Sequence, residues 1–373
     1  MHGGNIYQAK ERYGRTRFID LSANINPFGP PDGVLERLAG KLGSIVHYPD
    51  PESVSLRARM SELYDLPFEN IILGNGAGEL LFTILQALKP RRVLIPLPAF
   101  SEYRRAAEAV GAAVTPFFLG AKGWARLPLP ESARETERFA GEWRGLLSGQ
   151  DILFLCSPHN PTGTLLKRKQ FEILLEVAHT CGCRVIFDES FVDFLPDEKR
   201  WSAREYLAGY SNLTIVYSLT KFYSLPGLRL GAAFGRASDL KRFLQARDPW
   251  SVNVLAQEAG LAALENKTYA EDVREKLTQS RNFLYSGFER QRFRSWRLRP
   301  TWVNFALLEL LTGKADRLTE SLGKRGILVR DCSNFPGLEG EFVRIAVKTE
   351  SDMAQLLSAL REIEDEESFL GGR

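Results

Sequence analysis

The stretch SLTKFYSLPGLRLG, residues 218–231, places one lysine, Lys221, between a β-branched segment and a Pro-Gly turn. Small and apolar residues surround this lysine on both sides. Burying an ammonium group without a partner costs free energy, so such a lysine either extends its amine to solvent or has a chemical task. An amine in an apolar pocket loses part of its preference for the protonated form, and it then becomes a nucleophile toward an aldehyde.

The sequence on both sides of this stretch predicts the fold class. From about residue 70 onward, apolar runs such as NIILG, RRVLIPLP, DILFLCSP and LTIVYSLT alternate with amphipathic helical patterns. Strands that are apolar on both faces and separated by helices indicate an α/β fold with a mostly parallel sheet covered on both sides. We assign residues 46–252 to this large domain. A long helical stretch at about 252–290, followed by shorter strands and helices, predicts a small α+β domain made of residues 1–45 and 253–373.

Composition excludes several classes of protein. The 373 residues carry a net charge of +3 with scattered basic residues, which argues against nucleic acid as a partner. No apolar run is long enough to span a membrane, and the first twenty residues lack the apolar core of a secretory signal. The four cysteines and four histidines show no metal-ligand spacing. We therefore expect no bound metal, and buried thiols in a reducing cytoplasm.

Residues that follow the predicted strands decide the chemistry, because open α/β sheets bind ligands beyond the carboxyl ends of their strands. Gly76 and Ala77, in GNGAGELL, begin a helix whose free N–H groups suit a phosphate. Phe100 is placed to stack on a flat ring, Asn160 to hydrogen-bond a ligand oxygen, and Asp188 to pair with a buried cation. Taken singly, these features are equally compatible with a tight turn, a core aromatic, a turn signal and a helix cap.

Taken together, they match one molecule. Ser218 and Arg229 add a donor and a positive charge for the same anion that the glycine-rich turn suits. Pyridoxal 5′-phosphate has a phosphate, a flat ring, a phenolic oxygen, a ring nitrogen and an aldehyde, one for each of these groups. The sequence therefore predicts a pyridoxal-phosphate site in which Lys221 binds the aldehyde.

The chain resembles the fold type I pyridoxal-phosphate enzymes of the aspartate-aminotransferase type. The motifs NPTG, Asp-Glu and Ser-x-x-Lys…Gly-Leu-Arg occur in family order, and the resemblance covers nearly the whole chain. It implies that Lys221 forms the Schiff base, that Asp188 partners the ring nitrogen, and that Asn160 reaches the phenolic oxygen. It further implies that Phe100 stacks on the ring. The residues that it implies for the cofactor phosphate are Gly76, Ala77, Ser218 and Arg229.

The resemblance also implies a subunit partner and two substrate anchors. Tyr48, in HYPDPE, matches a tyrosine that the family contributes to the cofactor phosphate of the neighbouring subunit, which implies a homodimer. Arg344, in FVRIAV, matches the arginine that binds the substrate carboxylate. Arg330, in VRDCSNF, matches an arginine for a substrate phosphate in the branch that holds histidinol-phosphate aminotransferase and threonine-phosphate decarboxylase.

Within that branch, HGGN at residues 2–5 and SANINPFGPP at residues 22–31 resemble the threonine-phosphate decarboxylases, which make the aminopropanol phosphate part of cobalamin. This resemblance implies that His2 and Asn26 lie near the substrate phosphate together with Arg330. Phe191 stands where many aminotransferases of this fold have a tyrosine, which also fits a decarboxylase.

We therefore expect a carboxy-lyase that converts L-threonine O-3-phosphate to (R)-1-amino-2-propanol O-2-phosphate. One alternative is a histidinol-phosphate aminotransferase or related class I/II aminotransferase. Another is a non-catalytic regulator, although the sequence offers no segment for the DNA-binding module that such regulators carry.

Overall fold

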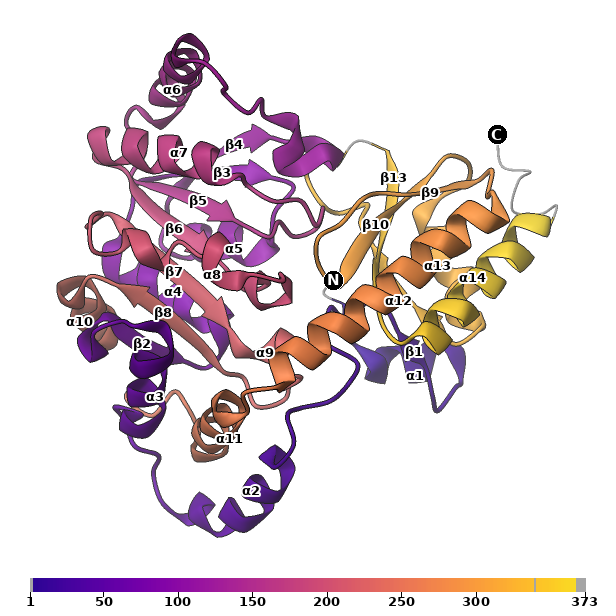
Figure 1. The fold of residues 1–373 in the computed structure, drawn as a ribbon, viewed down its shortest axis with the longest axis horizontal. Coiled ribbons are helices and arrows are strands. Elements are labelled where there is room, and N and C mark those ends of the chain that lie inside the picture. The colour runs from indigo at the N-terminus through magenta and orange to yellow at the C-terminus, as the bar shows by residue number, and fades with distance from the viewer. Residues whose placement is uncertain (1–2, 339, 367–373) are drawn as a thin grey trace.

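A seven-stranded sheet forms the centre of the larger part of the molecule. The computed structural model describes residues 3–338 and 340–366, and Figure 1 shows this sheet flanked by helices. In spatial order the strands are β2 (Ile71–Gly74), β8 (Gly231–Gly235), β7 (Leu213–Ser218), β6 (Arg184–Asp188), β5 (Ile152–Cys156), β3 (Arg92–Leu97) and β4 (Ala113–Phe118). β8 runs antiparallel to both of its neighbours, and the remaining pairings are parallel. The mostly parallel sheet predicted from the sequence is confirmed.

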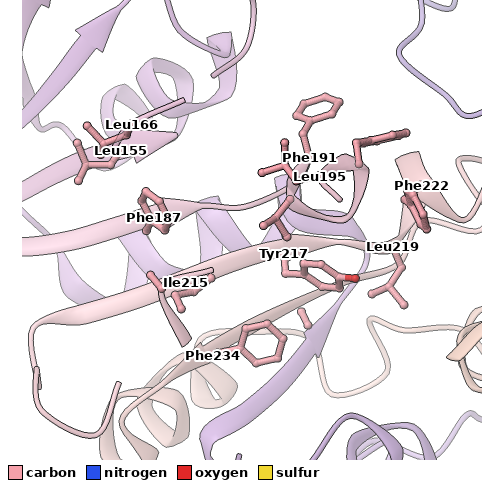
Figure 2. Packing of buried hydrophobic residues seen from close by; sticks show 14 of the residues in the cluster. Leu155, Leu166, Phe187, Phe191, Leu195, Ile215, Tyr217, Leu219, Phe222 and Phe234 are labelled. Atoms are coloured by element: carbon pink, nitrogen blue, oxygen red, sulfur yellow. The ribbon is translucent and has the colours of Figure 1, made fainter. Parts of the chain in front are cut away.

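Alternating side chains of these strands build two cores, one on each face of the sheet. Helices α4 (Gly76–Leu88), α5 (Ser101–Ala109) and α10 (Ala237–Gln245) pack on one face. The other face is covered by α3 (Val54–Tyr64), α6 (Ala133–Leu147) and α7 (Arg168–Thr180). In Figure 2, Phe187 of β6, Ile215 of β7 and Phe234 of β8 belong to this second core. β4 departs from the predicted pattern: it is an edge strand, and its side chains are half-buried or exposed.

Short helices connect these elements. Two of them are α-helical: α8 (Glu198–Trp201) and α9 (Leu219–Phe222). The 3-10 helices are η1 (Leu42–Val46), η2 (Phe68–Asn70), η3 (Gly120–Arg126), η4 (Val192–Phe194) and η5 (Arg204–Tyr206). α9 begins directly after β7, because the Ser218 side chain caps it by accepting a hydrogen bond from the Thr220 N–H. This early cap places Lys221 in the first turn beyond the strand.

A second, four-stranded antiparallel sheet forms the core of the smaller part. Its order is β12 (Arg330–Asp331), β13 (Glu341–Ala346), β10 (Phe305–Leu310) and β9 (Trp296–Leu298). Helices α13 (Ala315–Lys324) and α14 (Glu350–Asp365) pack against it with the C-terminal half of α12. The N-terminal segment joins this part: β1 (Ile19–Asp20) pairs with β11 (Ile327–Leu328), and α1 (Ile6–Tyr13) contacts α13.

The helical stretch predicted at about 252–290 consists of two helices, α11 (Val254–Glu265) and α12 (Tyr269–Gln291). The break occurs at Asn266, whose side-chain oxygen accepts hydrogen bonds from the N–H groups of Thr268 and Tyr269 and so begins the second helix. α11 and the start of α12 pack in the core of the large sheet, while the end of α12 packs on the small one. α2 (Val34–Lys41) lies against α11. Because packing runs across residues 46 and 252, these two domain boundaries stay a prediction.

Two further expectations concern the chain as a whole. All four cysteines are free; Cys156, Cys183 and Cys332 are buried and Cys181 is half-buried. In the part of the chain that the structure describes, no helix has both the length and the apolar character needed to cross a bilayer.

Candidate active site

A cavity of about 740 Å³ opens at the carboxyl ends of the large-sheet strands, between the large sheet and the small one. β6 ends at Asp188 and β7 at Ser218, while Asn160 follows β5 and Phe100 follows β3. Most of the predicted site residues line this cavity: Ala77, Phe100, Asn160, Asp188, Ser218, Lys221, Arg229, Arg330 and Arg344. Residues from segments that are distant in sequence therefore meet in one cavity, as we expected from their positions at the ends of the strands.

Lys221 lies in the middle of a positively charged group of residues. Burial disfavours its ammonium form, and the nearby guanidinium groups of Arg229 and Arg344 add repulsion; together they lower the pKa of Lys221 to about 8. Within the described part of the chain, no other side chain forms a hydrogen bond or ion pair with this amine. The amine is thus available as a neutral nucleophile close to neutral pH.

Asp188 lies on the floor of the cavity and is 5% exposed. Burial raises the pKa of its carboxyl group, while hydrogen bonds from Ser190 and Tyr103 and the charge of Lys221 oppose that shift. The Ser190 N–H donates to Oδ1 at 2.8 Å, and the Tyr103 hydroxyl donates to Oδ2 at 2.5 Å. A buried carboxylate with two donors is held in one orientation and can pair with a protonated nitrogen in the cavity.

The start of α4 forms an anion cradle with Ser218 and Arg229. The side chain of the N-cap residue, Asn75, forms no capping hydrogen bond with this helix. Gly76 has a φ of 84°, and the Arg229 guanidinium lies 2.5 Å from the position that a Cβ on Gly76 would occupy. Glycine is therefore required here both by its backbone conformation and by the approach of the arginine. Free N–H groups at a helix start, a hydroxyl and a guanidinium make a phosphate site.

Two arginines from the small sheet enter the same cavity from the other side. Arg330 of β12 pairs directly with Arg344 of β13, so both side chains lie on one face of the sheet. Arg344 donates to the Asn160 side-chain oxygen and to the Ser22 carbonyl, and Arg330 donates to Asn334 at 2.9 Å. Burial lowers the pKa of Arg344 to about 10 and also lowers that of Arg330. Such half-satisfied guanidinium groups are suited to bind anions of a ligand.

Comparison with protein families places this site in a known context. The family model described as "Aminotransferase class I and II" matches residues 16–360. The chain belongs to this family. It is therefore an enzyme of the fold type I class, and its cofactor is pyridoxal phosphate.

The similar proteins divide between two named activities, threonine-phosphate decarboxylase and histidinol-phosphate aminotransferase. A protein of Caldanaerobacter subterraneus, provisionally named threonine-phosphate decarboxylase, is 34% identical over 98% of this chain and 94% of its own length. The threonine-phosphate decarboxylase of Salmonella typhimurium is 33% identical over 97% of this chain and 96% of its own. An adenosylcobalamin biosynthesis bifunctional protein of Leptospira interrogans is 29% identical over 97% of this chain and 41% of its own length.

Solved structures show the same division. The histidinol-phosphate aminotransferase from Clostridium acetobutylicum has a TM-score of 0.81 and 26% identity, covering 93% of this chain and 99% of its own. The L-threonine-O-3-phosphate decarboxylase from Porphyromonas gingivalis has a TM-score of 0.79 and 27% identity, covering 94% and 99%. The fold type I architecture is confirmed.

The cavity of this aminotransferase-family enzyme fits pyridoxal phosphate in the chemistry of its donors. The cradle at Gly76 and Arg229 suits the phosphate, and the Phe100 ring lines the cavity where a flat ring would stack. Asp188 and Lys221, which line the same cavity, supply the carboxylate and the amine. Asn160 supplies a polar side chain for the phenolic oxygen. The assignment of these individual roles stays a prediction.

Asn26 differs from most of the predicted site residues, because it does not line the cavity. It is 2% exposed, and its side chain donates to the Phe222 carbonyl at 2.9 Å and accepts from the Phe28 N–H at 3.0 Å. Its own N–H donates to the Lys221 carbonyl at 3.0 Å. Asn26 thus braces the turn that carries the lysine, and a contact with the substrate phosphate has no support in this geometry.

Tyr48 is a second predicted residue that does not line the cavity. Tyr48 is 79% exposed and stacks on Trp250, with ring centroids 4.4 Å apart. Its predicted contact with the cofactor phosphate of a neighbouring subunit stays a prediction. His2 lies outside the described residues, although Gly3 beside it lines the cavity.

The sequence interpretation missed Asn24 and Tyr103, both of which line the cavity. Asn24 is 5% exposed, and its side-chain oxygen has no partner among the described residues. A tight turn, in which the Ile25 N–H donates to the Ala23 carbonyl, directs Asn24 and Asn26 to different places. Tyr103 follows Phe100 by three residues at the start of a helix, a spacing that places both on one face and was available from the sequence.

Proposed function

We propose that the protein decarboxylates L-threonine O-3-phosphate to (R)-1-amino-2-propanol O-2-phosphate, in cobalamin biosynthesis. The observation that carries this proposal is the direct pairing of Arg330 with Arg344 beside Lys221 in one cavity. A short substrate with a phosphate at one end and a carboxylate at the other needs two closely spaced cations. The threonine-phosphate decarboxylases among the relatives, and the cobalamin protein of Leptospira, support the same substrate.

The residues of the cavity have complementary tasks in this reaction. When bound, pyridoxal phosphate supplies an electron sink for the electrons of a bond broken at the substrate α-carbon. Arg330 binds the substrate phosphate and Arg344 the carboxylate, and two anchors on a short molecule fix its rotation. Lys221 holds a proton on Nζ and delivers it to the α-carbon, so that the departing CO2 is replaced by hydrogen. Its lowered pKa of about 8 suits an amine that must both gain and lose a proton near neutral pH.

Phe191 supports a decarboxylase over an aminotransferase. Its ring lines the cavity, is 5% exposed, and packs edge-on against Phe305 with centroids 4.9 Å apart. A tyrosine there would add a hydroxyl donor to the cofactor side of the cavity, and phenylalanine leaves that donor out. Figure 2 shows Phe191 and Leu195 among the buried residues of the core on the α3, α6 and α7 face of the large sheet.

Histidinol-phosphate aminotransferase is the second candidate. The solved enzyme of that activity from Clostridium acetobutylicum has the same fold, and its named substrate also carries a phosphate. An aminotransferase uses the same lysine to move a proton, so Lys221 and Asp188 do not separate the two activities. The two differ in the co-substrate, because transamination needs an oxo acid to accept the amino group.

The deciding experiment supplies O-phospho-L-threonine to the enzyme loaded with pyridoxal phosphate, without any oxo acid. We expect CO2 and aminopropanol phosphate in equal amounts over many turnovers. A parallel reaction contains histidinol phosphate and 2-oxoglutarate, with glutamate as the measured product. Glutamate formation there, with no CO2 in the first reaction, would refute the decarboxylase.

We also propose that the enzyme is a homodimer in which Tyr48 contributes to the neighbouring subunit's cofactor phosphate. Exposed apolar side chains concentrate on the arm formed by α2, η1 and the start of α3, and Trp250 lies beside it. These residues are Leu35, Leu42, Ile45, Val46, Tyr48 and Val54. A contiguous exposed apolar surface of this kind favours a protein interface.

Dimerisation is measured by analytical ultracentrifugation of the wild-type enzyme and of I45D, which places a charge on the arm. We expect a wild-type dimer and a monomeric I45D with weakened cofactor binding. Tyr48→Phe keeps the ring and removes only the hydroxyl, so it should leave the dimer intact while raising the cofactor Kd. A wild-type monomer that binds the cofactor fully would contradict the shared site.

A further inference from the structure

Tyr103, which lines the cavity, is hydrogen-bonded to Asp188. Its hydroxyl donates to Oδ2 of the carboxylate at 2.5 Å, and both residues are buried, with Tyr103 2% and Asp188 5% exposed. Tyr103 lies in the first turn of α5, after β3, and reaches across the end of β5 to the end of β6. A long-range contact between these two side chains thus joins three neighbouring strand ends.

The position of the Tyr103 ring is fixed by aromatic packing. It stacks on Phe154 with centroids 4.8 Å apart and planes 10° apart, and it meets Phe100 edge-on at 5.8 Å. Phe100 is the aromatic expected to stack on the cofactor ring. Since both neighbours hold the ring, the hydroxyl has little freedom to turn away from Asp188.

The hydrogen bond has a predictable effect on the carboxylate. A donor to a charged carboxylate favours the charged form, so Tyr103 opposes the burial that otherwise favours protonated Asp188. Tyr103 itself stays protonated, because burial and the Asp188 charge raise its pKa well above the usual value. Other titratable groups around Asp188 are Lys221, whose charge also favours the carboxylate, and the neutral thiol of Cys156.

We propose that Tyr103 is a positioning residue that keeps the negative charge on Asp188, and thereby keeps the proton on the ring nitrogen of the cofactor. If the carboxylate were more basic, the proton would move from the ring nitrogen to Asp188, and the ring would become a weaker electron sink. The inference rests on the proposed role of Asp188 at the ring nitrogen. It does not depend on whether the enzyme is a decarboxylase or an aminotransferase.

The test is the nitrogen-15 NMR shift of the ring nitrogen in enzyme loaded with 15N-labelled pyridoxal phosphate, without substrate. Tyr103→Phe keeps the packed ring and removes only the hydroxyl. A hydrogen bond to a charged group changes the proton affinity of Asp188 by roughly tenfold to a hundredfold. We expect the shift in Y103F to move toward that of neutral pyridine, and kcat to fall while KM changes little.

Tyr217→Phe is a matched control. The Tyr217 hydroxyl also donates to a buried carboxylate, Oδ2 of Asp193 at 2.6 Å, but Asp193 does not line the cavity. Both variants lose a buried hydrogen bond from a tyrosine to a carboxylate, and Y217F also removes the acceptor of the Tyr64 hydroxyl at 3.1 Å, so thermal unfolding should show at least as large a loss of stability in Y217F as in Y103F. Only Y103F should change the ring-nitrogen shift.

The possible outcomes separate the inference from the function it rests on. A wild-type shift typical of a protonated ring that D188A abolishes and Y103F leaves unchanged would overturn the role of Tyr103 alone. A neutral ring in the wild type, or an unchanged shift in D188A, would overturn the role of Asp188 and the inference with it. An equal change in Y103F and Y217F would assign the effect to general loss of packing and would also overturn it.

Discussion

Arg344 donates a hydrogen bond from Nη1 to the side-chain oxygen of Asn160, which lies 184 residues earlier in the chain. Arg344 belongs to β13 of the small sheet, and Asn160 follows β5 of the large one. Arg344 also donates from Nη2 to the Ser22 carbonyl at 3.3 Å. One guanidinium, proposed to bind the substrate carboxylate, therefore connects the residue expected at the cofactor oxygen with the N-terminal segment.

This connection predicts that Asn160 and Arg344 act on substrate binding as a unit. In N160A, Arg344 loses a charge-assisted hydrogen bond worth about 1.5–3 kcal/mol and is no longer held in place. We expect the Kd of O-phospho-L-threonine, measured from the cofactor's absorbance, to rise by roughly tenfold or more. In an R344A background, N160A should add little to that Kd. Additive effects of the two substitutions would show that the bond does not position the arginine.

The lowered pKa of Lys221 predicts how cofactor uptake depends on pH. The amine reacts in its neutral form, and the neutral fraction grows as the pH rises through the pKa of about 8. The rate at which cofactor-free enzyme binds pyridoxal phosphate should therefore rise from about pH 6.5, reach half of its maximum near pH 8 and level off above about pH 9, as measured by stopped-flow absorbance.

The charge of Arg344 provides a control for the pH profile, because it helps to lower the Lys221 pKa. Its removal in R344A should shift the profile to higher pH. K221A should give no borohydride-stable adduct at any pH and no turnover, with an unchanged thermal unfolding curve. A wild-type midpoint close to the ordinary lysine value of 10.5 would contradict this account of the cavity.

Much of the fold and most of the cavity could be predicted from the sequence, because both depend on local patterns. Asp188 and Ser218 each end a buried strand, and parallel strands bring such ends to one edge of the sheet. A residue that directly follows one of these strands can therefore be expected at the edge of the sheet where the site lies. Lys221, Asn160 and Phe100 were found in this way, and the structure brings them to one cavity.

The remainder depends on contacts between distant segments, which no local pattern specifies. Asn24 and Asn26 lie in one irregular segment, and only a turn at Ala23 decides which of them reaches the cavity. The break at Asn266 lies inside a stretch that the sequence pattern predicted as one helix. It comes from the Asn266 side-chain oxygen, which accepts hydrogen bonds from the N–H groups of Thr268 and Tyr269 at the start of α12. The hydrogen bond between Tyr103 and Asp188 joins residues that are 85 positions apart in the chain. It depends on the order of the strands in the sheet, in which a single strand, β5, lies between β3 and β6.

The anion cradle predicts a strong effect of adding one methyl group at Gly76. Alanine at a φ of 84° is strained by about 1 kcal/mol or more, and its Cβ would lie 2.5 Å from the Arg229 guanidinium. We expect G76A to displace Arg229 and to raise the Kd of pyridoxal phosphate about 10- to 100-fold, as measured by equilibrium dialysis.

A second glycine tests whether this effect is specific to the cradle. Gly141 lies in α6, where a Cβ would meet nothing within 4 Å. G141A should raise stability by about 0.5–1 kcal/mol, because alanine is the better helix former, and should leave the cofactor Kd unchanged. Equal cofactor affinity in G76A and the wild type would remove the cradle from the cofactor site.

Arg330 predicts the selectivity for phosphorylated substrates. Its guanidinium lies over the Phe335 ring, 5.1 Å from the centroid, and it donates to Asn334, so the side chain is held toward the cavity. Loss of a charge-assisted contact to a phosphate costs about 1.5–3 kcal/mol, which is roughly 10- to 150-fold in affinity. R330A should weaken the binding of O-phospho-L-threonine by this factor and leave the affinity for L-threonine unchanged. Both Kd values are measured by titrations that follow the cofactor's absorbance.

Arg317, which is exposed on α13, serves as the control, and R317A should alter neither Kd. If R330A weakened both ligands equally, Arg330 would bind the amino-acid end that they share, and the phosphate would have to be bound elsewhere in the cavity.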